Sequence, residues 1–143
     1  MRLSVTTPRG AVVDTEVDEL TAPGQLGEFG VLPGHVPLMS ALKPGVLTYW
    51  TQQRAATLAV GEGFLQVAPV AAGNTSTDRV LVLVDRATNA TSVDRAAAAT
   101  QLARLEGELA AWKQDLDGSY KALVVQRDWA QAQVDAATKL NPS

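Results

Sequence analysis

The chain contains one histidine, His35, within the stretch GEFGVLPGHVPL (residues 27–38). An imidazole can serve as a general base or a proton sensor near neutral pH. A Ser-His-Asp triad in this chain would have to use His35 as its base. Prolines and glycines flank the histidine on both sides, which is a poor frame for a positioned base. We therefore expect His35 to be a packed or hydrogen-bonded loop residue, with a specific contact as the alternative.

Three carboxylates, Glu16, Asp18 and Glu19, are the other candidates for chemistry. In a strand, Glu16 and Asp18 would point to the same side, as general acid–base work requires. A solvated strand face is the simpler interpretation. The chain has no cysteine, so disulfides, thiolate nucleophiles and cysteine-ligated metals are excluded. A single histidine also excludes metal sites with two imidazoles. We predict no catalytic residue, no metal and no cofactor.

The composition limits the kinds of partner that the chain can bind. The formal net charge of the 143 residues is −3, and acidic and basic side chains are interspersed. Nucleic-acid binding requires a basic patch, which the sequence lacks. The start MRLSVTTPRG is not that of a signal peptide, and no stretch approaches the ~20 apolar residues that cross a bilayer. We expect a soluble protein that associates with a membrane only through a partner.

The first half of the chain, up to about residue 86, has the pattern of β-structure. Short runs alternate or are rich in β-branched and aromatic residues: RLSVTT, TEVDELTAPG, PGVLTYW, TLAVGEGFLQVAP and RVLVLVD. Gly61 and Gly63 lie where a tight connection between two strands needs glycine. The continuous apolar run RVLVLVD predicts a strand that is buried on both faces. We predict an all-β sandwich or flattened barrel over residues 1–87.

The second half, residues 88–143, has a helical period. Two stripes recur at spacings of three and four: Leu102, Leu105, Leu109, Trp112 and Leu116, then Ala122, Val125, Trp129, Ala132 and Ala136. Gly118 can end the first helix, and Ser119 can cap the second. We predict a C-terminal antiparallel α-helical hairpin, with helices at about 92–116 and 119–138 whose stripes face each other and hold both tryptophans in the core.

Two polar segments have no predicted function. Residues 70–78 (VAAGNTSTD) are expected to form a protruding loop between strands. Asn74-Thr75-Ser76 and Asn89-Ala90-Thr91 match the acceptor pattern for N-glycosylation. Such matches occur by chance in polar loops, and we expect no glycan here.

Residues 17–47 (VDELTAPGQLGEFGVLPGHVPLMSALKPGVL) resemble the ε subunit of F-type ATP synthases, the counterpart of the mitochondrial δ subunit. That family carries the signature GE[FL]G[VI]LPGHAPL…ALKPG in its β-sandwich, and Val36 stands here where alanine is more common. LAVGEGFLQV (58–67) is similar to the family's next landmark. The strand RVLVLVD and the alanine-rich hairpin complete the order of elements. The specific part of the resemblance is the signature within residues 27–45.

The resemblance implies a non-catalytic subunit of the central stalk. In the family, this subunit turns with the γ subunit and the c-ring and couples proton-driven rotation to ATP synthesis in the α/β catalytic head. The family's GE[FL]G loop meets the polar loops of the c subunits, which here implies a contact through Gly27, Glu28, Phe29 and Gly30, with His35 nearby. In many bacterial relatives the hairpin also inhibits ATP hydrolysis. The implied location is the cytoplasmic face of a bacterial inner membrane, with an organelle counterpart as the alternative.

One family feature is not fully matched. Some relatives bind ATP with an [IL]DxxR motif at the start of the first helix and arginines on the second. This chain has Asp94 in VDRAA, but alanine stands at the arginine position and Arg95 comes two places early. Arg127 is the only arginine of the second predicted helix. We therefore do not expect ATP binding, and Asp94 has a sufficient role near a helix N-terminus.

Two other classes of protein compete with this interpretation. One is a small-ligand-binding or hydrolytic β-domain protein with a helical dimerisation hairpin, which should carry a cluster of ligands or a paired base in its β half. The other is an adaptor that uses the hairpin as a coiled-coil handle. Neither accounts for the signature within residues 27–45, and stable assembly with a γ-like partner would separate the first interpretation from both.

Overall fold

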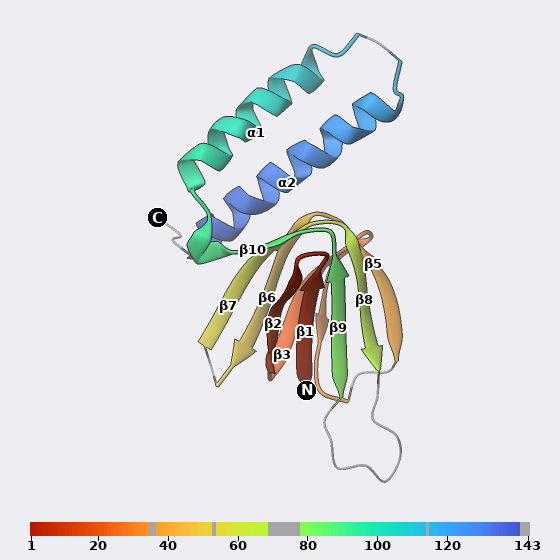
Figure 1. The fold of residues 1–143 in the computed structure, drawn as a ribbon, viewed down its shortest axis with the longest axis vertical. Coiled ribbons are helices and arrows are strands. Elements are labelled where there is room, and N and C mark those ends of the chain that lie inside the picture. Colours follow the sequence, from red (N-terminus) through yellow and green to blue (C-terminus); the bar gives the residue numbers. More distant parts are fainter. Residues whose placement is uncertain (35–36, 53, 69–77, 114, 141–143) are drawn as a thin grey trace.

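A computed structural model of the chain describes residues 1–34, 37–52, 54–68, 78–113 and 115–140 and joins a ten-stranded β-structure to two helices (Figure 1). The strands are, in chain order, β1 (Arg2–Thr7), β2 (Gly10–Glu16), β3 (Glu19–Gly24), β4 (Gly27–Val31), β5 (Leu38–Leu42), β6 (Gly45–Thr51), β7 (Arg54–Val60), β8 (Gly63–Ala68), β9 (Arg79–Val84) and β10 (Ala87–Asn89). A 3-10 turn, η1 (Ala90–Ser92), leads to α1 (Arg95–Ala110) and α2 (Gly118–Leu140). The predicted sandwich with a following helical hairpin is confirmed.

The strands form two sheets joined through β3. One sheet has the order β10-β7-β6-β3-β4, and the other has the order β5-β8-β9-β1-β2. The two meet where Gly24 of β3 pairs with Leu42 of β5. Neighbouring strands are antiparallel except for β1 and β9, which run parallel. The sheet therefore folds over on itself and encloses one apolar core.

The core is made by alternate residues of the strands, as the period of two requires. Its fully buried large members come from both sheets and are Leu3, Leu20, Leu42, Leu47, Leu58, Leu65, Val5, Val31, Val60, Val80 and Val82. Each such side chain contributes roughly 1.5–3 kcal/mol by leaving water. All of them precede residue 85, so the sandwich core contains no side chain from the hairpin.

The strand RVLVLVD differs from its prediction. In β9 the valines Val80, Val82 and Val84 are buried, but Leu83 is 48% exposed and Leu81 is half-buried. The expectation that both faces are covered is wrong, because the helices pack on the other sheet, against β6 and β7. The outer face of β9 is thus apolar and uncovered.

Gly61 and Gly63 connect the two sheets rather than the strands of one hairpin. β7 pairs with β6 and β10, whereas β8 pairs with β5 and β9. A Cβ on Gly61 would collide with the carboxylate of Asp85, and one on Gly63 would collide with the Leu83 carbonyl. Glycine is needed at Gly63 because the backbone of β9 comes close, and at Gly61 because the Asp85 and Arg86 side chains do; neither has a positive φ.

The helix bounds and the cap of the second helix differ from the prediction: α1 is shorter, whereas α2 is slightly longer. α1 ends at Ala110, although its stripe continues to Trp112 and Leu116. Trp112 instead packs edge-on against Tyr120 of α2, with ring centres 5.6 Å apart. α2 begins at Gly118 rather than after it, because the carboxylate of Asp117 accepts the Ser119 and Tyr120 amides at 2.9 and 3.3 Å. Asp117 is therefore the cap in place of Ser119.

Among the described residues, the hairpin packs on the sandwich mainly through the second half of α2, which lies against β6 and β7 (Figure 1). The contact is a small cluster of buried alanines with two larger neighbours, and its members are Ala59, Ala90, Ala132, Ala136, Val46 and Trp129. The prediction that the whole α2 stripe faces α1 is therefore wrong for its second half. Because these side chains are small, α2 can lie close to the outer face of β6 and β7. This explains why the second half of α2 packs on the sheet.

Two cations join the same contact. The guanidinium carbon of Arg86 lies 5.1 Å from the centre of the Trp129 ring, within the range of a cation–π interaction. The Lys139 ammonium donates a hydrogen bond to the Thr48 hydroxyl at 3.1 Å. Arg86 and Thr48 belong to the sandwich, so both interactions hold the hairpin against it.

Candidate partner-binding site

The residues predicted to contact the c-ring lie in strand β4 and not in a loop. Gly27 to Val31 pair antiparallel with β3, and Gly24 stands opposite Gly27 across a two-residue turn, Gln25-Leu26. Gly27 has φ +133°, a conformation that L side chains rarely adopt. The glycines suggested a loop, but in the structure they allow a tight hairpin turn between β3 and β4. His35 lies outside the described residues.

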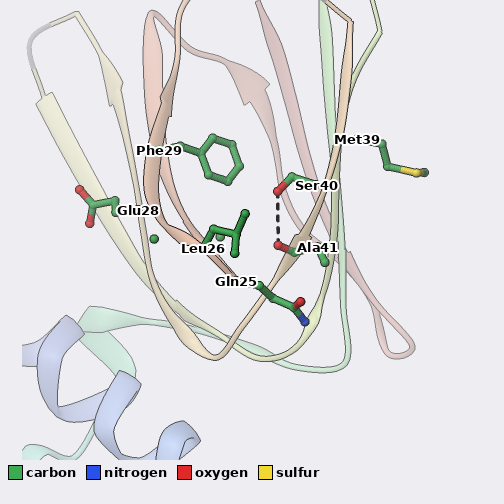
Figure 2. Close-up of a pocket in the computed structure, with 9 residues that line it drawn as sticks. Gln25, Leu26, Glu28, Phe29, Met39, Ser40 and Ala41 are labelled. Carbon is green, nitrogen blue, oxygen red and sulfur yellow. Dashed lines mark hydrogen bonds between the residues drawn. The ribbon is translucent and has the colours of Figure 1, made fainter.

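The side chains of this hairpin point in different directions (Figure 2). Glu28 is exposed, whereas Phe29 is half-buried and packs against the sandwich core. Gly24 makes room for the ring, since a Cβ there would lie 2.9 Å from Phe29 Cδ1. Leu26, at the tip of the turn, is fully exposed. Leu26 was missed by the sequence reasoning, although an apolar residue between Gly24 and Gly27 is a signal for an exposed apolar tip.

A shallow depression of about 480 Å³ lies beside this turn. The turn and the start of β4 form one wall and β5 forms the other (Figure 2), with the lining residues Gly24, Gln25, Leu26, Gly27, Glu28, Phe29, Met39, Ser40 and Ala41. Glu28 is the only ionisable side chain in this lining. One carboxylate with glycines and apolar groups suits contact with another protein surface better than catalysis or metal binding.

The depression continues into an apolar outer face on the sheet of β5, β8 and β9. We call this the apolar face and define it by Met39, Ala41, Phe64, Leu81 and Leu83. Ala41, Phe64 and Leu83 stand opposite one another across the three strands, whereas the exposed Gln66 stands between Met39 and Leu81. Met39 is 67% exposed and Phe64 54% exposed. Within the described ranges no element covers this face, and contiguous exposed apolar side chains mark an interaction site.

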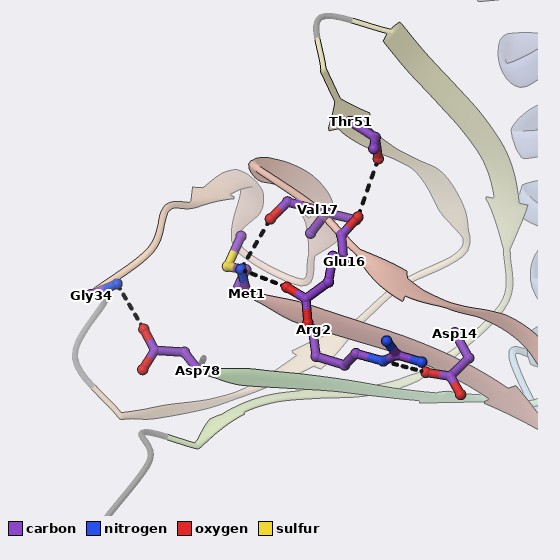
Figure 3. Close-up of polar contacts among 8 residues, drawn as sticks. All are labelled: Met1, Arg2, Asp14, Glu16, Val17, Gly34, Thr51 and Asp78. Carbon is purple, nitrogen blue, oxygen red and sulfur yellow. Dashed lines mark hydrogen bonds and ion pairs between the residues drawn. The ribbon is translucent and has the colours of Figure 1, made fainter. Parts of the chain in front are cut away.

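Charged side chains lie on the same sheet beyond the apolar face. Arg2 Nε donates to Asp14 Oδ1 at 2.8 Å between β1 and β2 (Figure 3). The hydrogen bond from Arg2 and its positive charge hold the pKa of Asp14 below its usual value, and Asp14 in turn raises the pKa of Arg2. Both side chains are exposed, so this pair contributes little to stability.

The three clustered carboxylates are not one acid–base site. Glu16 ends β2 and forms an ion pair with the N-terminal amine of Met1 at 3.4 Å. Asp18 lies between strands, and its carboxylate accepts the Gln52 amide at 2.9 Å. Glu19 begins β3 and is exposed. Because β2 ends at Glu16, the expected strand geometry that would align Glu16 with Asp18 is absent.

Two of the three residues considered for a nucleotide site have a local partner, and the third is exposed. Asp94 is the N-cap of α1, where its carboxylate accepts the Ala97 amide at 3.0 Å. Arg95 is the exposed first residue of α1. Arg127 on α2 forms an ion pair with its neighbour Asp128 at 2.7 Å.

The polar segments without a predicted function remain without one. Asn89 caps η1 by accepting the Thr91 amide at 3.0 Å. Asn74 and most of the 70–78 segment lie outside the described residues. Among those that are described, no three side chains are grouped to hold a metal ion, and no helix is long and apolar enough to cross a membrane.

This geometry defines a class of protein: a small binding subunit that presents an apolar sheet face and an exposed hairpin turn and carries its helices on the opposite sheet. Residues 1–90 match the family model of the ATP synthase delta/epsilon chain, β-sandwich domain. The chain belongs to this family. Its relatives are ε chains, which are non-catalytic subunits, so the resemblance suggested by residues 17–47 is confirmed and the alternative of a hydrolytic β-domain is not supported.

Individual relatives agree with the family model. An ATP synthase epsilon chain of Syntrophotalea carbinolica is 42% identical over 109 residues, which are 76% of this chain and 73% of the relative. An ATP synthase epsilon chain of Geobacter metallireducens is 39% identical over 121 residues, or 85% of this chain and 81% of the relative.

Solved structures share the fold. A chain of the Euglena gracilis mitochondrial ATP synthase aligns with a TM-score of 0.66 at 20% identity, covering 98% of this chain and 78% of that one. A chain from the central stalk and c-ring of the Tetrahymena thermophila enzyme aligns with a TM-score of 0.63 at 16% identity, covering 96% of both. At these identities the likeness supports the fold alone.

Proposed function

We propose that this chain is the ε subunit of a rotary ATP synthase, which binds the γ subunit through the apolar face and the c-ring through the β3–β4 turn. The apolar face carries the proposal, because no described element covers it, whereas α2 packs on β6 and β7 of the other sheet. In a monomer, the neighbouring side chains of Met39, Phe64 and Leu83 are exposed to water. A binding partner would bury this apolar surface.

The turn is suited to a different partner surface. Leu26 offers an apolar tip, and Glu28 adds a negative charge on the same hairpin. Gly27 and Gly30 have no side chain, so a partner backbone can approach closely. This combination of one apolar anchor, one charge and open backbone fits the polar loops of a c-ring. The depression lined by Met39 to Ala41 makes the turn continuous with the apolar face.

In this role the subunit transmits torque and performs no bond chemistry. To bind γ and the c-ring at the same time, the subunit must make contacts on two sides and be rigid between them. The close-packed core between the two sheets supplies that rigidity. We place the subunit at the cytoplasmic face of a bacterial inner membrane, held there by the complex.

The hairpin is the proposed regulatory part. Its contact with the sandwich consists of alanines, one tryptophan and two cationic side chains. Each alanine buries far less area than a leucine, so the docking energy is modest. A weakly docked element can be shifted by a second binding partner that prefers its released form. Release of α2 toward the catalytic head is the proposed route by which this subunit inhibits ATP hydrolysis.

The test is co-assembly in native membranes. Tagged wild-type chain is captured from membranes that hold the synthase, and the γ, α and β subunits in the capture are quantified. Phe64→Asp on the apolar face is expected to lower γ recovery about tenfold or more. Leu116→Asp is the matched control, since Leu116 is also an exposed apolar residue but lies in the connection between the helices. Capture of wild-type chain without γ, from membranes in which the synthase is intact, would contradict the proposed function.

A further inference from the structure

The centre of the signature stretch follows β4, and there Gly34 is bonded to Asp78, the residue just before β9 (Figure 3). The Gly34 amide donates to Asp78 Oδ2 at 2.7 Å, across 44 residues of chain. A donor–acceptor distance of 2.7 Å is in the range of charge-assisted hydrogen bonds. Gly34 has φ +80°, so the backbone at this point is a sharp turn that favours glycine.

Asp78 is itself fixed to the sheet. Its carbonyl accepts the Arg2 amide at 2.8 Å, directly before the parallel pairing of β1 with β9. The carboxylate therefore projects from a rigid edge of the sandwich, and the residue next to Gly34 in the signature is His35. On the other side of Gly34, Leu32 is 57% exposed. The bond thus sets where an exposed apolar side chain and the turn beside it stand relative to β5.

A second aspartate makes the same kind of bond at a different turn. Asp18 Oδ2 accepts the amide of Gln52, which has φ +51° and lies between β6 and β7. Each of the two carboxylates thus binds the amide of a residue with positive φ in a distant turn. The Asp18 bond holds a turn outside the signature stretch, so it provides a matched comparison.

We propose that Asp78 is a positioning residue for partner binding, which holds the turn at Gly34 in the free subunit so that residues 32–34 are presented ready to bind. This inference rests on the proposed function, because the partner is the γ subunit–c-ring assembly. Ordering this turn in advance removes part of the entropy cost that binding would otherwise carry. Without the carboxylate, the Gly34 amide would donate its hydrogen bond to water, and the turn would no longer be bonded to the residue before β9.

The experiment measures the bond and its consequence separately. Hydrogen exchange at the Gly34 amide is followed by NMR in the full chain, and affinity is measured for a γ subunit–c-ring subassembly. Asp78→Ala should speed Gly34 exchange at least about tenfold and weaken binding about three- to tenfold. Asp78→Asn keeps an acceptor oxygen and should recover most of both. Asp18→Ala should speed exchange at Gln52 and leave binding unchanged.

The outcomes are distinct. Unchanged Gly34 exchange in Asp78→Ala, or unchanged binding despite faster exchange, would overturn the positioning role. An equal loss of binding in Asp18→Ala would also overturn it, since the effect would then be general. If the wild-type chain does not bind the subassembly, the proposed function is refuted, and with it the positioning role of Asp78. Measuring the wild-type chain first separates this outcome from a failure of the positioning role alone.

Discussion

At the scale of residues, the Arg2–Asp14 pair makes stability depend on pH. The pKa of Asp14 is lower in the folded chain than in the unfolded chain, because Arg2 donates to its carboxylate. A carboxyl with a lowered folded pKa stabilises the fold above its unfolded pKa of about 3.9 and loses that contribution as pH falls through the folded value. The raised pKa of Arg2 has the same origin, and its contribution to stability is lost only when the pH becomes strongly alkaline.

Asp14→Asn should therefore lower the urea midpoint slightly at pH 7, and the difference from wild type should close as pH falls below about 4. Because both partners are exposed, added salt should shrink the difference at pH 7 as well. Urea titrations at several pH values measure both effects. Asp115→Asn, on the exposed connection between the helices, is the control. A difference that persists at low pH would show that the effect of the substitution is not electrostatic.

The candidate site was predictable in part at this scale. The sequence directed attention to residues 27–30, and the structure places them in β4 with Glu28 exposed. It did not predict that Phe29 packs half inside, because a loop was expected where a strand alternates sides. Leu26 was missed because its exposure depends on a two-residue turn. Asp78 could not be found from spacing, since its bond to Gly34 depends on how two distant connections meet in the folded sheet.

At the scale of elements, the docking of α2 depends on small side chains. Ala136 is fully buried beside Ala59, Ala90 and Ala132. A leucine at this position would push the helix away from β6 and β7, because overpacking a filled interface costs about 1–3 kcal/mol. The sandwich core would be untouched, since none of its members lies in the hairpin.

Ala136→Leu is thus expected to release the hairpin without unfolding the sandwich. Hydrogen exchange should rise across the second half of α2 and stay unchanged in β8 and β9, which lie in the other sheet. Ala122→Leu is the matched control, because Ala122 is exposed on the same helix and the helix propensity changes equally. Equal protection of α2 in both variants would mean that the alanine contact does not hold the hairpin.

Sequence periodicity predicted where strands and helices occur better than it predicted which elements pack against each other. The period of 3.6 identified both helices, and the pattern of short apolar runs identified β1, β6, β7, β8 and β9 but not β4, which was expected to be a loop. Which face of an element meets which neighbour is a property of the assembled fold. This is why β9 was expected to be buried on both faces, and why Trp129 and Ala136 were assigned to the seam between the helices when they face the sheet.

At the scale of the whole molecule, the chain has two apolar clusters that share no residue. The larger fills the sandwich and extends from Met1 to Val84, with Ala87 packed at its edge. The smaller is the alanine cluster between α2 and the sheet. Leu105 of α1 is fully buried but belongs to neither cluster. The sandwich therefore has its own source of stability, and the hairpin is attached to it.

A chain of residues 1–92, which keeps β10 and η1, is therefore expected to fold alone. It should unfold in one cooperative transition, with a smaller urea slope than the full chain because less surface is exposed on unfolding. Its melting temperature should lie within about 5 °C of the sandwich transition in the full chain, since removal of α2 uncovers mainly Val46 and Ala59. Calorimetry and urea titration measure these quantities. Leu65→Ala in the shortened chain, at a fully buried core position, should cost about 2–5 kcal/mol. A shortened chain that lacks a cooperative transition would mean that the hairpin supplies stability that the two separate clusters do not reveal.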